Sequence, residues 1–226
     1  MGEESKDMRF TDGLLMMNDA ARFLGIPRQT FHRWARGYER GEPLLHVVQP
    51  VRGSQARVTF IALAEAWVLY ALREAGVVTR RIRPALTRLQ SEFGREYVLV
   101  AQELATDGID VLWDFARTEP SGEGLIAGHT GQHVMREIVT DYLKYVSWGD
   151  DGLPRMLNLR HCEPSKVVVD PARAFGQPIF AGSRVRVADV AAMLKAGEDP
   201  GVVAQEHGIG PDDVRTAARV LLGRAA

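Results

Sequence analysis

Residues that bind metals or act as nucleophiles in other proteins gather between positions 129 and 162 of this 226-residue sequence. His129 and His133 are four apart, a spacing that lets two imidazoles share a metal ion when both lie on one helix. Gly131 lies between them in a predicted turn, and no CxxC or HExxH pattern accompanies them. His161 and Cys162 are adjacent and have no further ligand at a metal-binding spacing. We therefore predict no metal, no cofactor and no catalytic residue. An enzyme that uses these histidines is the weakest of three hypotheses for the function.

Arginine offers a second kind of chemistry, the binding of phosphates and base edges in nucleic acids. Between Ala20 and Gln90 the sequence holds twelve arginines against four acidic residues, although the whole chain has a formal net charge of -1. Residues 94–165 reverse this balance, with six Lys or Arg against twelve Asp or Glu. Such a cationic segment favours a nucleic-acid partner, and the alternative is an ordinary solvated surface.

Two short helices with a tight turn between them are predicted to position the first of these arginines. Asn18 or Asp19 can cap the first helix, and Gly25 can end it in the left-handed conformation. Pro27 then begins a second helix over about residues 28–36. This spacing predicts a helix-turn-helix, whose second helix fits the major groove of B-DNA. The alternative is a helical hairpin with a solvated arginine face.

The second helix is amphipathic, and a basic hairpin is predicted after it. Phe31 and Trp34 are three apart and share the apolar face of the helix. Two β-rich runs, residues 45–49 and 56–60, flank a turn and predict a hairpin that grips the DNA backbone as a wing. The candidate DNA-binding residues of the helix and the wing are Arg28, Gln29, Thr30, His32, Arg33, Arg36, Arg52 and Arg57.

Two further helices are predicted, one that reaches about Ala75 and one that ends before Gly94. Together with the preceding elements, the stretches MNDAARFLGIPRQTFHRWAR, RVTFIALAEAWVLYALREAGV and RRIRPAL resemble the winged-helix DNA-binding domain of MerR-type regulators. This resemblance implies binding to operator DNA. MerR-type proteins continue into a long dimerising coiled coil, whereas this chain continues with β-rich sequence after Phe93.

Residues 94–165 are predicted to form a small α+β unit with a mostly antiparallel sheet. Short apolar runs at residues 97–101 and 109–113 are separated by polar, turn-prone residues and indicate strands. Two more runs around Gly128 and Gly131 indicate a hairpin, and the segment LPRMLNL indicates a closing strand.

The C-terminal part of the chain has clear helix signals. Three helices are predicted over about residues 187–196, 200–207 and 211–222, and Asp199 is the predicted cap of the second. The stretch before them, FGQPIFAGSRVRV, contains no catalytic residue type, but Pro178 and its glycines favour an ordered backbone. It is predicted to present apolar side chains for docking, either to this chain or to another one.

This lead-in and the helices after it closely resemble a small domain of bacterial antitoxins, whose usual form is Gly-x-Pro-x-Ile/Phe-x-Gly-Thr-Arg-Val-Pro-Val. Here Ser183 replaces the threonine and Arg186 replaces the second proline. The whole arrangement resembles VapB-type antitoxins with an N-terminal helix-turn-helix. The resemblance implies a cognate PIN-domain ribonuclease toxin as partner and repression of the shared operon. The candidate toxin-binding residues are Phe175, Ile179, Phe180, Arg184, Arg186 and Arg224.

The predicted fold class is therefore α+β, in three parts. Residues 1–93 are predicted to form a MerR-like winged-helix DNA-binding domain, residues 94–165 the small α+β domain, and residues 166–226 a three-helix, helix-turn-helix-like domain. No apolar run approaches the roughly 20 residues of a membrane span, and a single cysteine allows no internal disulfide. We expect a cytoplasmic homodimer with no membrane partner. The second hypothesis for the function is a MerR-like transcriptional regulator with a ligand-sensing middle domain and no toxin partner.

Overall fold

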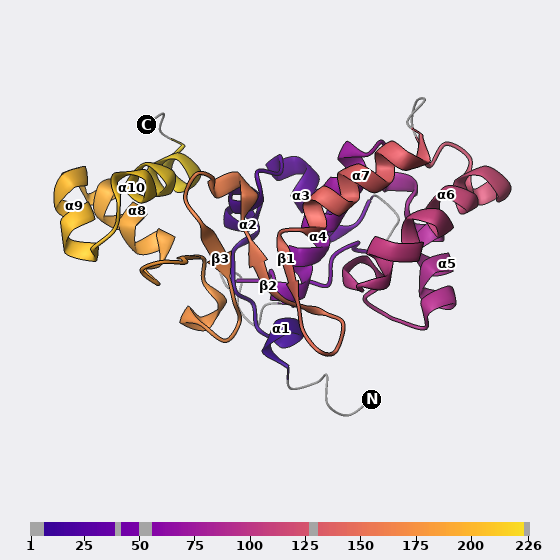
Figure 1. The fold of residues 1–226 in the computed structure, drawn as a ribbon, viewed down its shortest axis with the longest axis horizontal. Coiled ribbons are helices and arrows are strands. Elements are labelled where there is room, and N and C mark those ends of the chain that lie inside the picture. Colours follow the sequence, from indigo (N-terminus) through magenta and orange to yellow (C-terminus); the bar gives the residue numbers. More distant parts are fainter. Residues whose placement is uncertain (1–6, 39–41, 50–55, 127–130, 224–226) are drawn as a thin grey trace. The chain divides into compact units, whose positions relative to one another are not determined.

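The computed structural model describes residues 7–38, 42–49, 56–126 and 131–223 (Figure 1). Over these ranges the chain is mainly helical and contains one four-stranded antiparallel sheet, so the α+β prediction is confirmed. The strands lie in the order β1 (Val146–Trp148), β2 (Pro154–Asn158), β3 (Val167–Val169) and β4 (Ile179–Phe180). The helices are α1 (Met8–Thr11), α2 (Met17–Leu24), α3 (Arg28–Arg36), α4 (Phe60–Glu74), α5 (Arg83–Phe93), α6 (Ile109–Thr118), α7 (Gln132–Leu143), α8 (Val187–Ala196), α9 (Pro200–His207) and α10 (Pro211–Ala217).

The chain divides into two compact units, each assembled from segments that are far apart in the sequence. The boundary passes through α3, between His32 and Arg33. Neither unit is one continuous segment, so the two units cannot be matched one to one with the three consecutive domains that the sequence suggests. That three-domain division stays a prediction. The first unit comprises Met1–His32, Val47–Phe60 and Met156–Ala226, and the second comprises Arg33–His46 and Ile61–Arg155.

Helix α2, in the first unit, ends as predicted but begins differently. Gly25 ends it with φ 67°, and the N–H of this glycine donates to carbonyls in the last turn of α2. The N-cap residue is Met16, and no side chain caps the helix, so the prediction of a cap by Asn18 or Asp19 is wrong. Asn18 Oδ1 instead lies 3.0 Å from His32 Nε2, so this polar side chain connects the two helices of the motif.

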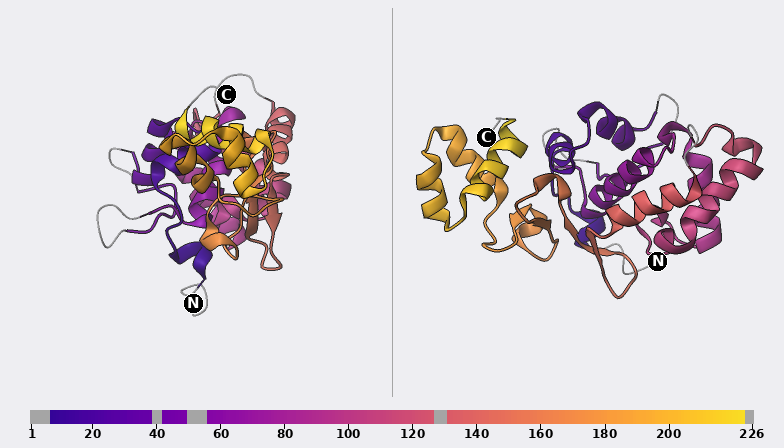
Figure 2. Two further views of the ribbon diagram at one scale, coloured as in Figure 1. Left: turned by 90° about the vertical axis from the view of Figure 1, so that its left-hand side faces the viewer. Right: turned by 45° about the horizontal axis from the view of Figure 1, so that its top comes forward.

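Within the first unit, α2 packs against segments that come from the C-terminal part of the chain (Figure 2). These segments are a 3-10 turn at Arg160–Cys162 and the π-helical turn Ala218–Leu222 that follows α10. The apolar face of α2 consists of small and aromatic side chains that are buried, namely Ala20, Ala21, Phe23 and Leu24. Parts of the two ends of the chain thus share one core.

Helices α8 and α9 have the bounds that the sequence predicts, whereas α10 ends at Ala217 and the rest of the third predicted helix is the π-helical turn Ala218–Leu222. Asp199 caps α9, because its Oδ1 accepts the N–H groups of Gly201 at 2.8 Å and Val202 at 3.2 Å. Gly197 and Gly208 end α8 and α9 in the left-handed conformation. Before these helices, β3 pairs antiparallel with β2 and β4, and its three valines are all buried, as expected for a strand covered on both faces.

The second unit is built around α4, whose residues from Ile61 to Leu69 are all buried. The indole N–H of Trp67 donates to the carbonyl of Tyr142 at 2.9 Å, which ties α4 to the end of α7. Helix α4 ends at Glu74, before Gly76, and α5 ends at Gly94 in the left-handed conformation, both as predicted.

Most of the strands predicted for the middle of the chain are wrong. Residues 97–101 hold a 3-10 turn, Val98–Val100, and residues 109–113 lie in α6. Ile109, Leu112 and Phe115 are buried, which is a helical spacing that a five-residue run cannot distinguish from a strand. The predicted hairpin around Gly131 is instead the start of α7, whose buried residues recur every fourth position at Met135, Val139 and Leu143. Gly128 lies outside the described residues. The predicted closing strand is confirmed as β2.

The predicted wing hairpin has less strand structure than expected. In residues 45–49 and 56–60 the structure has no extended strand, and Phe60 already begins α4. What remains is one backbone hydrogen bond, from Val48 N–H to the Arg57 carbonyl at 2.9 Å. The turn between the two runs, with Arg52, lies outside the described residues.

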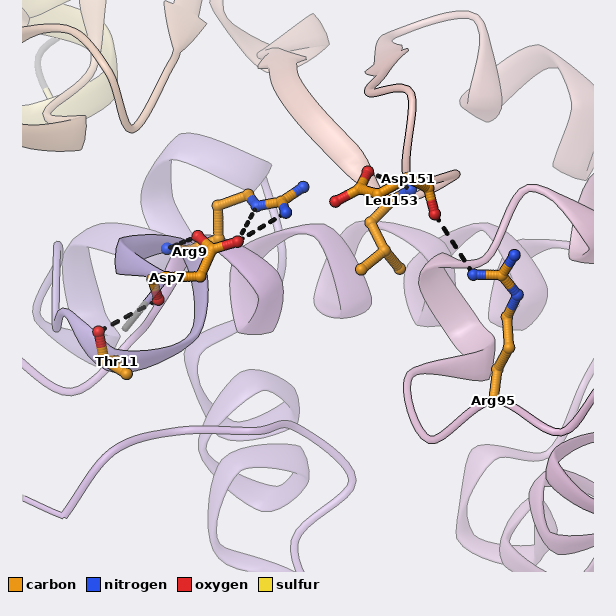
Figure 3. A network of polar contacts seen from close by, with 6 residues as sticks. All are labelled: Asp7, Arg9, Thr11, Arg95, Asp151 and Leu153. Carbon is orange, nitrogen blue, oxygen red and sulfur yellow. Dashed lines mark hydrogen bonds and ion pairs between the residues drawn. The ribbon is translucent and has the colours of Figure 1, made fainter. Parts of the chain in front are cut away.

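Local polar contacts hold loops in both units (Figure 3). In the first unit, Asp7 caps α1 by accepting the N–H of Arg9 at 2.9 Å, and its backbone carbonyl accepts from Thr11 Oγ1 at 3.1 Å. In the second unit, Asp151 Oδ1 accepts the N–H of Leu153 at 3.0 Å. Among the described residues, no helix is both long and apolar enough to span a bilayer.

Candidate nucleic-acid interface

Helix α3 has the predicted bounds and the predicted division of its faces. Phe31 and Trp34 are completely buried. The polar residues of the helix are exposed at Arg28, Gln29, Arg33 and Arg36 and half-buried at Thr30 and His32. The helix is therefore fixed by its apolar face and presents a cationic row to solvent, as a recognition helix requires.

The three arginines of α3 differ from many other arginines in having no side-chain partner among the residues that the structure describes. Arg88 pairs with Glu92 one turn away, and Arg95 pairs with Glu103. Within the described residues, Arg28, Arg33 and Arg36 have neither an ion pair nor a hydrogen bond from their side chains. Three unpaired guanidinium groups on one helix leave their donors available to phosphates or base edges.

In the second unit, a buried hydroxyl supports the C-terminal half of α3. Thr79 Oγ1 accepts the indole N–H of Trp34 at 3.2 Å and lies 3.1 Å from the Tyr38 hydroxyl. Thr79 begins a 3-10 turn, Thr79–Arg81, that precedes α5. Neither Thr79 nor Tyr38 is predicted from the sequence, because a single threonine among arginines gives no signal before its partner is known.

A buried carboxylate holds the chain that leaves α3. Glu65 on α4 is 1% exposed, and its carboxylate accepts the backbone N–H of His46 at 2.8 Å and lies 2.5 Å from His46 Nδ1. Burial acts to lower the pKa of His46, but the hydrogen bond and the charge of Glu65 outweigh it and raise the pKa above 6.5. The sequence contained a signal for this contact, because Glu65 is the only acid within the apolar stretch FIALAEAWVLYAL.

Of the two predicted wing arginines, the structure describes Arg57. It is half-buried, and its side chain has no hydrogen bond or ion pair within the described residues. The neighbouring residue Val58 is bridged to Leu15, which leads into α2. Arg57 is thus joined through the backbone to the start of the helix-turn-helix, and its role in DNA binding stays a prediction.

The apolar residues predicted for toxin binding lie in two different environments. Ile179 and Phe180 form β4 and are 1% and 2% exposed, so they are packed within this chain and present no apolar surface to a partner. Phe175 is 84% exposed and lies in a turn, Ala174–Gly176, whose three residues all have positive φ. Of this group, Phe175 is the residue that a partner can reach directly.

The arginines predicted for toxin binding are exposed where the structure describes them. Arg184 has φ 63° and no hydrogen bond or ion pair from its side chain within the described residues. Arg186 pairs with Asp189 at 2.8 Å in the first turn of α8. Arg224 lies outside the described residues. Toxin binding by these residues stays a prediction.

The histidines and the cysteine considered for catalysis lie in ordinary structural positions. Burial raises the pKa of Cys162 to about 12, which suppresses the thiolate that a nucleophile needs. Burial and the nearby Arg219 lower the pKa of His161. His133 lies on α7, not in the predicted turn, and is 3.5 Å from Glu137 one turn on. His129 lies outside the described residues, and among the described ones no three His, Cys, Asp or Glu gather in a metal-binding group.

Comparison with protein families supports a DNA-binding class for the N-terminal part. Residues 13–86 match the family described as "Putative DNA-binding HTH domain". Residues 167–219 match the family described as "Protein of unknown function (DUF433)". The first match contains all of α2, α3 and α4, and the second contains the tail from β3 to α10.

The chain belongs to the family of the protein named "Putative antitoxin VapB45" from Mycobacterium tuberculosis. The two are 42% identical, over 96% of this chain and 97% of that protein. "Uncharacterized protein Rv2308" from the same organism is 26% identical, over 87% of this chain and 84% of that protein. The crystal structure of Rv2018 from Mycobacterium tuberculosis has a TM-score of 0.75 and 42% identity, and the match covers 92% of this chain and 99% of that chain. The resemblance to VapB-type antitoxins with an N-terminal helix-turn-helix is confirmed.

Proposed function

We propose that this protein is a DNA-binding antitoxin that neutralises a protein toxin and represses its own operon. The observation that carries the proposal is the row of exposed arginines on α3, which have no side-chain partner among the described residues and lie in a segment that matches a DNA-binding family. The name of the VapB45 relative supports the antitoxin part. In this proposal the protein is a non-enzymatic regulator that acts in the cytoplasm, where its DNA is.

The DNA part of the mechanism is electrostatic first and sequence-specific second. Arg28, Arg33 and Arg36 neutralise phosphates and release counterions, so affinity falls steeply with salt concentration. Gln29 and Arg28, in the first turn of α3, are candidates for base contacts, because a recognition helix meets base edges near its N-terminus. A homodimer would present two such helices about 34 Å apart, one DNA turn, to a pseudo-palindromic operator.

The toxin part of the proposal assigns the C-terminal segment to partner binding. A PIN-domain toxin has a cluster of metal-binding carboxylates, and an inserted arginine would compete with the metal by charge. Arg184 is exposed and unpaired within the described residues, and the exposed ring of Phe175 is available as an apolar anchor. Arg186 and Arg224 remain further candidates. Aromatic and arginine side chains are the residues that most often dominate binding energy at protein interfaces.

Co-expression with the product of the adjacent gene tests both parts. We expect the two chains to co-purify, the ribonuclease activity of the toxin to disappear, and the complex to retard DNA from upstream of the gene pair. Retardation without a co-purifying toxin would favour the ligand-responsive regulator instead. A chain that retards neither this DNA nor an unrelated duplex at low salt would contradict the proposal for α3.

A further inference from the structure

The base of the predicted wing is a short backbone bridge between two segments of the first unit. The N–H of Leu14 donates to the carbonyl of Val58 at 2.8 Å, and the N–H of Arg57 donates to the carbonyl of Leu15 at 3.1 Å. Leu15 is followed directly by the N-cap of α2, and Arg57 is a candidate DNA contact. The bridge therefore sets the position of the wing base relative to the start of the helix-turn-helix.

A side chain from the C-terminal part of the chain holds this bridge. Gln177 Nε2 donates to the carbonyl of Leu14 at 2.5 Å, although the two residues are 163 positions apart in the sequence. The backbone of the same loop also lies on Leu14, because a Cβ added to Gly176 would stand 2.6 Å from Leu14 Cδ1. Gly176 leaves the room that the leucine side chain occupies, and Gln177 satisfies the carbonyl.

A second contact of the same kind covers the turn of the helix-turn-helix. The guanidinium of Arg219 donates to the carbonyls of His161 at 2.9 Å and Glu163 at 3.0 Å. The imidazole of His161 lies against Gly25, since a Cβ at that glycine would be 2.6 Å from His161 Nδ1. The turn between α2 and α3 and the base of the wing are thus both packed against the C-terminal part of the first unit.

We propose that Gln177 is a positioning residue for DNA binding. Gln177 belongs to the segment assigned above to the toxin, but its amide acts on the other function by fixing Leu14 and, through the backbone bridge, Arg57. Without the amide, the Leu14 carbonyl loses its donor and the bridge is free to shift. The arginines are then misplaced, although none of them has been removed. This inference rests on the proposed DNA binding.

Two substitutions test it in the full-length chain. Gln177→Met keeps the length of the side chain and removes the donor, and Gln177→Glu places a carboxylate against the Leu14 carbonyl. Binding to the DNA upstream of the gene is measured across a salt series. We expect about a three- to tenfold loss of affinity for Gln177→Met, the effect of one hydrogen bond, and a larger loss for Gln177→Glu. The slope of log affinity against log salt should not change in Gln177→Met, because this substitution removes no positive charge.

Gln205→Met is the matched control, because it makes the same substitution at an exposed glutamine on α9 in the same unit. It should leave DNA affinity unchanged. Hydrogen exchange provides a readout that needs no DNA. The amides of Leu14 and Arg57 should exchange faster in Gln177→Met, while those of α8 and α10 keep their protection.

Three results would overturn the inference. Wild-type affinity in both Gln177 variants would show that the amide positions nothing. Weaker DNA binding by Gln177→Met with unchanged exchange at Leu14 and Arg57 would mean that Gln177 contacts the DNA directly and positions nothing. Faster exchange throughout the unit would show a loss of stability only. Failure of the unsubstituted chain to bind either the upstream DNA or an unrelated duplex would remove the proposed DNA binding itself, and this inference with it.

Discussion

Helix α3 and the turn Ala174–Gly176 both present side chains to solvent without a partner in the described part of the chain, but they do so at different energetic cost. The arginines of α3 lie on a regular helix, and a solvated guanidinium is stable in water. Phe175 is 84% exposed, with φ 54°. A left-handed backbone costs about 1–2 kcal/mol for a residue with a Cβ, and an exposed ring recovers none of it. The isolated chain gains nothing from Phe175 in this position.

This difference separates two kinds of binding surface. A charged helix face can attract DNA over a distance, but such faces are common on surface helices. It indicates DNA binding only when the surrounding fold is a DNA-binding one. A strained, exposed aromatic residue is rarer, and it is retained where the surrounding structure holds it for a purpose. Here the surroundings are Gly176 on Leu14 and the Gln177 hydrogen bond, which fix the turn from one side.

The largest expected effect comes from removing charge on α3. Arg28→Ala combined with Arg33→Ala should weaken binding to the upstream DNA by about thirtyfold or more, because each lost base contact costs about 1–3 kcal/mol. Both residues are exposed, so the melting temperature should stay close to that of the unsubstituted chain. Gel retardation across a salt series measures both affinity and slope.

Arg117→Ala combined with Arg155→Ala is the control for the loss of two positive charges. Both arginines are exposed, and neither belongs to the helix-turn-helix. Equal losses of affinity in the two double variants would mean that net charge alone governs binding, and that α3 is not a recognition helix.

A smaller effect, on the other surface, is expected from Phe175→Ala. Truncation of a central aromatic anchor costs about 2 kcal/mol, so affinity for the toxin should fall about thirtyfold while DNA affinity stays the same. Titration calorimetry with the purified toxin measures this. Val202→Ala, which shortens an apolar side chain that is 50% exposed on α9, should have no such effect.

Phe175→Gly adds a measurement that needs no toxin. Glycine accepts the left-handed conformation freely, so this variant should be more stable to denaturant than Phe175→Ala by about 1 kcal/mol. Equal stability of the two variants would mean that the turn is not strained, and the contrast between the two surfaces would disappear.

The smallest expected effect is a pH dependence of the free energy of unfolding, caused by the pairing of Glu65 with His46 in the segment that follows α3. The pKa of His46 is raised above its unfolded value of 6.5, so its pairing with Glu65 stabilises the fold fully below pH 6.5. This contribution is lost as the pH rises through the raised pKa. The imidazole is 42% exposed, so the change should stay below about 1 kcal/mol. Thermal unfolding between pH 6 and 9 should show it in the unsubstituted chain and not in His46→Ala.

The sequence predicted the elements whose signals are local. Helices α3, α8 and α9 were bounded correctly. Gly25, Gly197, Gly208 and the Asp199 cap each act within one turn of a helix end. The polar face of α3 followed from the spacing of Phe31 and Trp34. Such signals need no knowledge of distant partners.

The predictions failed where a segment's conformation depends on contacts that are distant in sequence. The apolar run at residues 109–113 is compatible with a strand or with a helix. It forms part of α6 because of its packing within the second unit. Asn18 satisfies the local rule for a cap, but it lies opposite His32 instead. The sequence contains no sign of the contacts made by Thr79 and Gln177, because their partners lie 45 and 163 positions away. It shows Glu65 as an unusual acid in an apolar stretch, but not its partner His46.

The division of the chain within α3 has a consequence for how this protein can be rearranged. A gene fragment that encodes residues 1–93 would carry the whole helix-turn-helix and omit Met156–Ala226, which completes the first unit. The surface of α2 that rests on the C-terminal segment would then be bare. A transfer of residues 1–93 alone to another protein would therefore give a helix-turn-helix without part of its core. Recombination would have to transfer Met156–Ala226 as well to give a complete unit.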